Sequence, residues 1–450
     1  MTGLSRRTFM AATGVGLVAP GIVTAAAAAG PNPRVEEVVG RSGVRAYLLR
    51  EPSTPFISVR FVFADAGAAQ DPPEKAGLAN MASGLLDEGA GPYDSGSFRA
   101  ALEDNAIRLS FDADRDGFSG RLETLNENRD LAVELLMLAL TEPRFEEEAV
   151  ERIRAQILTE LRRRESDPND RAGLAWFREA FGAHPYARAV RGTPETVAAI
   201  TREDLVELTR TRLARGNLHV GVAGDITPGE LADLLDAAFG SLPEAPQLPP
   251  VPATTLQRAG VVVEPLPVPQ SVVVFGHEGI DRHDPDFYAA YVANYILGGG
   301  GFSSRLTEEI REKRGLVYGV YSYLMDLVHC PLWMGGLATS NENVKTAIGL
   351  VARECRRMAE GDVGEKDVAD AKTYLIGSFP LRFTSNDSVA RMLVTMSVQK
   401  LGRDYLERRN AYIEALTPED VRRVCARLFS RDILIAVAGQ PEGLEPTRAG

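Results

Sequence analysis

The order of apolar and polar positions predicts strands followed by long helices, twice along the chain. Residues 107–113 alternate between apolar and polar side chains, which is the period of a half-buried strand. Longer helical patterns follow over residues 128–140 and 146–165. Helices over 285–297 and 303–313, strands over 316–323 and 332–338, and then helices to 428 are predicted in the second part. This grouping favours an α+β fold, with mainly antiparallel sheets and helices packed on one face of each.

The chain also repeats itself at a nearly constant offset. Three pairs of segments correspond at offsets of 212, 216 and 215 residues: 62–67 with 274–279, 200–205 with 416–421, and 217–224 with 432–439. Segments that keep one order and one offset indicate a duplicated domain. A proline-rich stretch over 243–252 would be stiff and extended. We therefore predict two homologous domains, residues 30–242 and 254–450, joined by a linker over 243–253.

The first 29 residues have the layout of an export signal. Ser5-Arg6-Arg7-Thr8-Phe9-Met10 precedes an apolar stretch to residue 23 and a run of small residues over 25–29. This order is typical of a cleaved signal of the twin-arginine route, and it predicts a periplasmic protein. A cytoplasmic chain with an amphipathic start is the alternative. The most apolar later run, residues 131–140, is too short to span a bilayer and contains a glutamate, so we expect no membrane attachment after signal removal.

Composition excludes some functions and raises one question. The 450 residues include 62 acidic and 50 basic side chains, and a net charge of -12 argues against a nucleic-acid partner. Three cysteines cannot form a disulfide framework. The chain has five histidines: His184, His219, His277, His283 and His329. None of them has the i, i+4 spacing that holds zinc on one helix, and we expect His277 and His283 to be solvated loop residues.

Residues 74–84 (EKAGLANMASG) resemble the active-site helix of the pitrilysin/insulinase family of zinc peptidases, the inverzincins. That family has H-x-x-E-H at this position. The resemblance extends through residues 184–186, 191–195 and 217–225, and it covers essentially the whole chain after the export signal. It implies two homologous domains that form half of a clamshell.

The resemblance also shows that the metal chemistry is lost. Asn80 stands at the first histidine, Ser83 at the glutamate and Gly84 at the second histidine. The reaction needs two imidazoles and a distant carboxylate as ligands, and a glutamate that takes a proton from zinc-bound water. Glu160 stands where the family keeps its third ligand, but alone it cannot hold a metal. A solvated helix carboxylate among Arg162–Arg164 is the simpler interpretation of Glu160. We expect no metal in this chain.

The second half keeps different family residues. Arg311 and Tyr318, seven positions apart, match the family's Arg…Tyr element, which holds substrate carbonyls and donates to the oxyanion of the tetrahedral intermediate. Without the resemblance, they would be interpreted as a helix-end cation and a strand aromatic. The run Gly298, Gly299, Gly300 and Gly301 resembles the glycine-rich loop of family subunits that recognise substrate without cutting it. A flexible hinge is the alternative for this run.

These residues predict a non-zinc-binding subunit of a heterodimeric zinc peptidase. A homologous partner with an intact H-x-x-E-H would bring zinc and the base, and this chain would contribute Arg311 and Tyr318 to the hydrolysis of peptides. We expect the chain alone to be inactive. A catalytically silent peptide-binding or scaffold subunit of the same fold is the alternative, and a cytoplasmic chaperone-like partner is a third.

Overall fold

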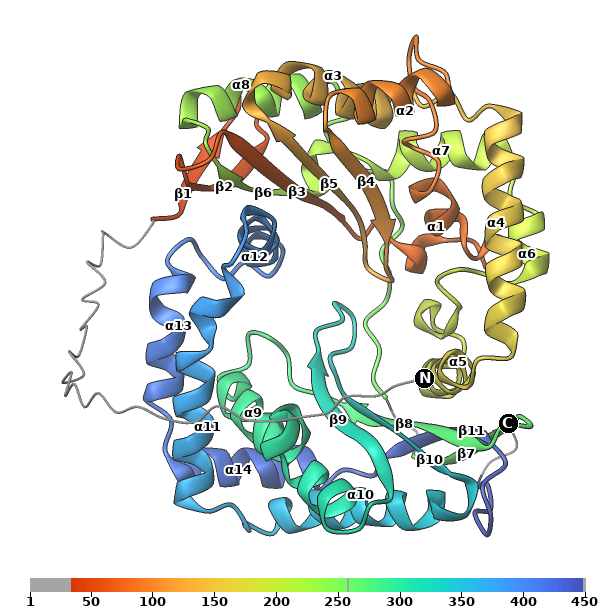
Figure 1. Ribbon diagram of the computed structural model, residues 1–450, viewed down its shortest axis with the longest axis vertical. Coiled ribbons are helices and arrows are strands. Elements are labelled where there is room, and N and C mark those ends of the chain that lie inside the picture. Colours follow the sequence, from red (N-terminus) through yellow and green to blue (C-terminus); the bar gives the residue numbers. More distant parts are fainter. Residues whose placement is uncertain (1–33, 257–258, 448–450) are drawn as a thin grey trace, which may run out of the picture. The chain divides into compact units, whose positions relative to one another are not determined.

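The computed structural model describes residues 34–256 and 259–447 (Figure 1). The predicted export signal lies outside the described residues. The first sheet has six strands in the order β1-β2-β6-β3-β5-β4. Its strands are β1 (Glu36–Val39), β2 (Arg45–Arg50), β3 (Phe56–Ala64), β4 (Arg108–Ala113), β5 (Gly117–Leu125) and β6 (Leu218–Gly224).

The second sheet has five strands in the order β7-β11-β8-β10-β9. Its strands are β7 (Gly260–Pro265), β8 (Gln270–Glu278), β9 (Val317–Met325), β10 (Leu332–Ser340) and β11 (Leu434–Gly439). The pairs β2–β6 and β7–β11 are parallel, and the other pairs are antiparallel. The five strands therefore repeat the order and directions of β2-β6-β3-β5-β4, which confirms the duplication and the α+β fold predicted from the sequence.

Helices follow the strands in both halves. The first half contains α1 (Leu78–Ser83), α2 (Ser95–Asp104), α3 (Arg129–Thr141), α4 (Glu147–Glu165), α5 (Pro168–Phe181), α6 (Pro194–Ala198), α7 (Arg202–Arg212) and α8 (Pro228–Phe239). The second half contains α9 (Phe287–Asn294), α10 (Val344–Ala359), α11 (Glu365–Gly377), α12 (Asn386–Val398), α13 (Tyr405–Glu414) and α14 (Pro418–Phe429). In the described ranges, no helix has both the length and the apolar character needed to cross a membrane.

The matched helix starts at residues 201 and 417 have the same cap. Thr201 accepts a hydrogen bond from the backbone of Asp204, and Thr417 accepts one from the backbone of Asp420. The side chain of each Asp in turn accepts a hydrogen bond from the backbone N–H of its Thr, which gives a capping box at both helix starts. The helix predicted over 303–313 is instead a short π-helical segment, η8 (Thr307–Glu312), and a second one, η6 (Tyr295–Gly299), continues α9.

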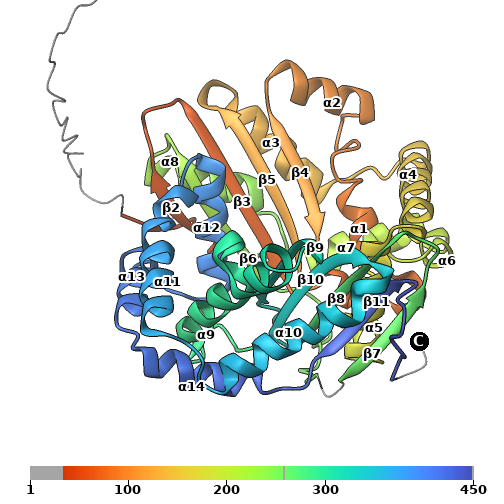
Figure 2. The same cartoon turned by 60° about the horizontal axis from the view of Figure 1, so that its bottom comes forward.

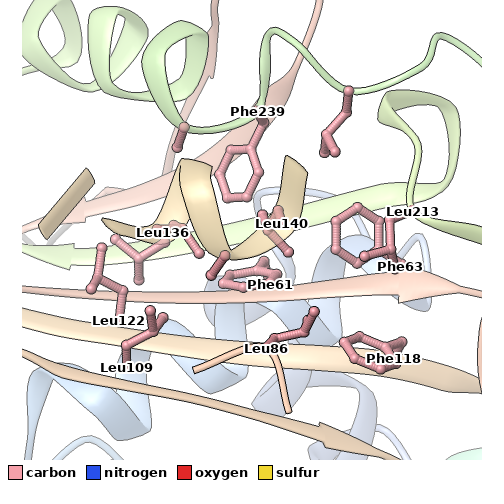
Figure 3. Packing of buried hydrophobic residues seen from close by; sticks show 14 of the residues in the cluster. Phe61, Phe63, Leu86, Leu109, Phe118, Leu122, Leu136, Leu140, Leu213 and Phe239 are labelled. Atoms are coloured by element: carbon pink, nitrogen blue, oxygen red, sulfur yellow. The ribbon is translucent and has the colours of Figure 1, made fainter. Parts of the chain in front are cut away.

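The core of the first half is built on Phe61, which points from β3 toward α3 and α8 (Figure 3). Its ring contacts Phe239 of α8 edge to face, with 5.4 Å between centroids. A Cβ on Gly120 of the neighbouring β5 would overlap the Phe61 ring, so glycine is required there. The small residue Gly120 thus makes room for the large ring of Phe61 directly opposite, and this pairing fixes the register between β3 and β5.

The two halves exchange one helix each. Helix α12, from the second half of the sequence, packs against β6, β3 and β2, and α5, from the first half, packs against β11, β8 and β7 (Figures 1 and 2). Leu48 points into the core under α3 and α8, whereas its neighbour Leu49 contacts the α12 cluster, so the six-stranded sheet is covered on both faces. A Cβ on Gly221 of β6 would lie 2.5 Å from the carbonyl oxygen of Ala390 in α12, which explains the glycine.

Polar contacts fix both exchanged helices. Asp387 of α12 forms an ion pair with Arg60 of β3. The indole Nε1 of Trp176 in α5 donates to the carbonyl oxygen of Leu434 in β11 at 3.0 Å. Arg178 of α5 also pairs with Glu264 of β7 at 2.6 Å. Because each helix completes the other half's core, we expect the two halves to unfold together.

His277 corrects one prediction, because it is not a solvated loop residue. It lies on β8, is 2% exposed, and stacks on Trp333 of β10 with 4.8 Å between ring centroids. The side chain of Trp333 extends over it from a strand 56 positions away in the sequence, which the local pattern near residue 277 does not reveal. His283, in contrast, is exposed as predicted.

Burial of His277 makes stability depend on pH. Burial lowers its pKa from 6.5 to about 4, so between these values the unfolded state binds a proton that the folded state does not. The contribution of neutral His277 to the free energy of unfolding is therefore fully present above pH 6.5. It is lost as the pH decreases, and the loss is on the order of 3 kcal/mol at pH 4. Urea unfolding at pH 7 and pH 4.5 should show a smaller loss in His277→Phe than in the wild type. His283→Gln, an exposed control, should behave as the wild type, and equal losses in all three proteins would contradict the assignment.

Candidate functional site

The helix at the zinc-motif position is held by a buried ion pair. Asp71 accepts hydrogen bonds from the backbone N–H groups of Gly77 and Ala79, at 3.1 and 3.2 Å. Its other partner is Arg212 of α7, at 2.8 Å, and both side chains are almost fully buried. Gly77 has a φ of 97°, a left-handed conformation that favours glycine, and it starts α1. The Asp71–Arg212 pair and the two backbone hydrogen bonds therefore fix the start of α1.

The three motif positions carry no ligand chemistry. Ser83 donates its hydroxyl to the carbonyl oxygen of Asn80 at 2.8 Å, so it is engaged within its own helix. A Cβ on Gly84 would meet Ile153 of α4 at 3.6 Å and the carbonyl oxygen of Met81 at 3.8 Å, which are ordinary contact distances, and the φ of Gly84 is -83°, so the backbone does not require glycine there. Within residues 34–256 and 259–447 no group of three or more His, Cys, Asp or Glu side chains is arranged to hold a metal ion.

Glu160 lies on α4 and pairs with arginines of the same helix. It accepts hydrogen bonds from Arg163 and Arg164, at 2.7 and 2.9 Å. These bonds lower the pKa of Glu160 to about 2. Arg164 also pairs with Asp170 at 2.8 Å, so the carboxylate belongs to a chain of charges at the end of the helix. These neighbours are those of a helix carboxylate in an ion-pair network, so Glu160 needs no metal to explain its position.

Arg311 and Tyr318 lie together, and the structure adds Phe302 to them. The guanidinium carbon of Arg311 is 4.7 Å from the ring centroid of Phe302 and 5.4 Å from that of Tyr318. The cation thus contacts both aromatic rings. Tyr318 is 90% exposed and Phe302 is 75% exposed, so both rings and the phenol hydroxyl face outward. Phe302 was not predicted from the sequence, although its place directly after four glycines marked it.

The glycine run lies beside this cluster and is closely packed. A Cβ on Gly298 would lie 2.8 Å from the backbone nitrogen of Ser322 in β9, and one on Gly299 would lie 2.8 Å from the amide nitrogen of Asn294. Gly300 is similarly close to the carbonyl oxygen of Tyr295. Gly301 has open space around it and a φ of +57°. The run therefore brings the chain close to β9 and then turns it outward into Phe302.

Behind the cluster, a buried network holds β9 in place. Asn294 accepts hydrogen bonds from the hydroxyl of Ser322 at 2.8 Å and from the indole of Trp333 at 3.0 Å. It also donates to the carbonyl oxygen of Ser322 at 3.2 Å. On the other side of β9, an edge strand, Tyr318, Tyr321 and Tyr323 are exposed. The strand thus presents a row of phenols on a rigid base.

Sequence comparisons agree with this geometry. The family model described as Insulinase (Peptidase family M16) matches residues 45–194, and the model described as Peptidase M16 inactive domain matches residues 199–375. The chain is 29% identical to the non-peptidase homolog YmxG of Helicobacter pylori over 344 residues, 76% of this chain and 78% of that protein. It is 27% identical to an uncharacterized zinc protease of Streptomyces coelicolor over 400 residues, 86% of each chain.

The chain is also similar to solved structures. The crystal structure of a peptidase M16 inactive domain from Pseudomonas fluorescens is similar with a TM-score of 0.85 and 27% identity, covering 92% of this chain and 100% of that one. A chain of Complex III2 from Candida albicans is similar with a TM-score of 0.76 at 18% identity, covering 91% and 97%. At that identity, the second likeness concerns the fold alone.

Proposed function

Because the chain belongs to the insulinase (M16) peptidase family, we propose that it is the non-zinc-binding subunit of a heterodimeric zinc peptidase. The observation that carries the proposal is the division of family residues within one chain. Asn80, Ser83 and Gly84 replace every catalytic residue of the motif, whereas Arg311 and Tyr318 are kept and lie together. A homologous partner with H-x-x-E-H would supply the zinc, its ligands and the general base.

In this proposal, Arg311 and Tyr318 act on a peptide held at the partner's site. The phenol hydroxyl of Tyr318 donates to the oxygen that gains negative charge as water attacks the peptide carbonyl. The guanidinium of Arg311 donates to substrate carbonyls. The Nε of Arg311 lies 3.6 Å from Oε1 of its neighbour Glu312, so most of the N–H donors of Arg311 stay available. Contact with Phe302 and Tyr318 limits the freedom of the guanidinium before substrate arrives.

The experiment is to identify and reconstitute the partner. Tagged full-length chain is purified from native periplasm, and the co-purifying proteins are searched for H-x-x-E-H. We expect a homologous chain with that motif in 1:1 ratio, and peptide hydrolysis only when both chains are present. A complex that lacks such a chain would contradict the proposal. The same fractionation tests the periplasmic location, and a partner without its own signal would be carried across bound to this chain.

A catalytically silent subunit is the second candidate, and the similarity to a non-peptidase homolog favours it. Such a subunit would bind peptides or hold a complex together without contributing to cleavage. It has no need of an exposed phenol beside a guanidinium, which is the argument against it. A stable complex with H-x-x-E-H partner and zinc, in which Tyr318→Phe leaves cleavage unchanged, would establish this second function.

A further inference from the structure

A cavity of about 430 Å³ opens in the first half, away from the Arg311 cluster. It is bounded by the end of α4, the exposed side of α5, the loop 189–194 and Arg115 from the turn between β4 and β5. Its size lies in the range of sites for small ligands or a few peptide residues. None of the residues discussed for catalysis lines this cavity.

One part of the cavity is apolar and rigid. Leu161, Leu174, Phe177 and Val190 line it. Phe177 stacks on Phe181 with 5.8 Å between centroids and contacts Trp176 edge to face at 5.2 Å, so its ring is fixed by the core of α5. Leu174 is 44% exposed, which makes it one of the more exposed large apolar side chains. An apolar ligand group would cover this surface and remove it from water.

Another part carries positive charge without ion-pair partners. The guanidinium carbon of Arg115 lies 3.5 Å from the ring centroid of Phe177, and its Nε donates to the carbonyl oxygen of Tyr186 at 3.2 Å. In the part of the chain that the structure describes, Arg115 and the exposed Arg191 form no ion pair. Burial lowers the pKa of Arg115 to about 10, because it disfavours the charged form, and the nearby carboxylates of Asp116 and Asp114 partly oppose this shift.

Most other charges around the cavity have partners of their own, and Asp114 and Asp116 attract Arg115 without forming an ion pair with it. Arg164 is paired with Asp170, and Arg171 is paired with Glu264 at 2.6 Å. The nearby carboxyl group of Asp116 is engaged by the hydroxyl of Tyr186 and the backbone of Val328. Glu165, at the rim, is the remaining acidic side chain that lines the cavity. The cavity therefore combines a fixed apolar wall with unpaired guanidinium groups.

We propose that this cavity binds a carboxylate attached to an apolar group. The carboxylate pairs with Arg115 and Arg191, and the apolar group lies against Leu161 and Leu174. Guanidinium groups are the preferred partners of carboxylates, since they offer paired donors of matching geometry. The C-terminal residue of a peptide and a free fatty acid share this chemistry. The site is independent of the heterodimer proposal, because it needs neither zinc nor a partner chain.

Calorimetric titration of the purified full chain tests the site. The probes are an N-acetylated hexapeptide ending in leucine with a free carboxylate, the same peptide as its C-terminal amide, and decanoate. We expect at least one of the two free acids to bind. If the peptide is the ligand, its amide should bind at least 10-fold more weakly than its acid. Arg115→Gln should weaken acid binding at least 10-fold. Binding of decanoate alone identifies a fatty acid, and binding of the peptide acid alone identifies a peptide C-terminus.

Two further variants keep the test decisive. Arg191→Gln, at an exposed position, should weaken acid binding several-fold without changing the melting temperature, so it serves even if Arg115→Gln fails to fold. Arg163→Gln, on the same helix α4 but outside the cavity, is the matched control and should bind as the wild type. Binding of neither acid, equal binding of peptide acid and amide, or unchanged binding by both cavity variants would overturn the proposal.

Discussion

Tyr318→Phe is expected to slow peptide hydrolysis by the reconstituted heterodimer roughly 100- to 1,000-fold, the usual cost of removing one donor to a developing oxyanion. The change deletes a single hydroxyl from a side chain that is 90% exposed, so the fold and the partner interface should stay intact. Because the hydrogen bond forms chiefly in the transition state, kcat should fall while KM changes little. Steady-state kinetics on a fluorogenic peptide measure both constants.

The neighbouring strand residue provides a matched control. Tyr321 is also exposed on β9 and 56% accessible, but it does not contact Arg311. Tyr321→Phe should therefore turn over substrate at the wild-type rate. Arg311→Ala should lower kcat/KM by a similar factor to Tyr318→Phe, with a larger rise in KM, since its donors hold the substrate before and during reaction. Equal kinetics for Tyr318→Phe and Tyr321→Phe would remove Tyr318 from the mechanism.

The second large effect is on stability. Trp176→Ala is expected to lower the free energy of unfolding by about 3–5 kcal/mol, as for other buried large aromatics. The side chain is fully buried, contacts Phe177 and Phe181, and donates to Leu434. Since α5 belongs to the first half but covers the second sheet, the loss should appear in both halves at once.

Urea unfolding, followed by far-ultraviolet circular dichroism and by hydrogen exchange of both sheets, shows whether the two halves unfold together or separately. We expect one transition, shifted to lower urea in the variant, with protection lost together in β3 and β8. Leu174→Ala, on the exposed side of the same helix, should change the free energy of unfolding by less than about 1 kcal/mol. Two separate transitions, with only the second sheet affected by Trp176→Ala, would show that the helix exchange does not couple the halves.

Much of the fold could be predicted from sequence, because its signals are local. The patterns over 128–140 and 146–165 correspond to α3 and α4 within a residue or two, and the Thr caps mark α7 and α14 in both halves. The helix exchange could not be predicted. The apolar faces of α5 and α12 look the same whichever sheet they cover, and their partners are hundreds of residues away, as Arg60 is from Asp387.

The site was predictable only where residue type alone decides the chemistry. Asn80, Ser83 and Gly84 cannot replace zinc ligands and a base in any conformation, so the sequence was sufficient for that inference. The contact of Arg311 with both rings depends on the turn after Gly301, which the sequence does not specify. The cavity beside Arg115 was invisible to sequence reasoning, since four separate segments form it.

The central claim is that this chain needs a partner for zinc chemistry, and one paired measurement tests it most directly. Zinc content, by atomic mass spectrometry, and peptide turnover are measured on the purified chain alone and on its 1:1 complex with the H-x-x-E-H partner. The account predicts no stoichiometric zinc and no turnover for the chain alone, and one zinc per heterodimer with turnover that depends on Tyr318. Stoichiometric zinc together with peptidase activity in the chain alone would contradict it.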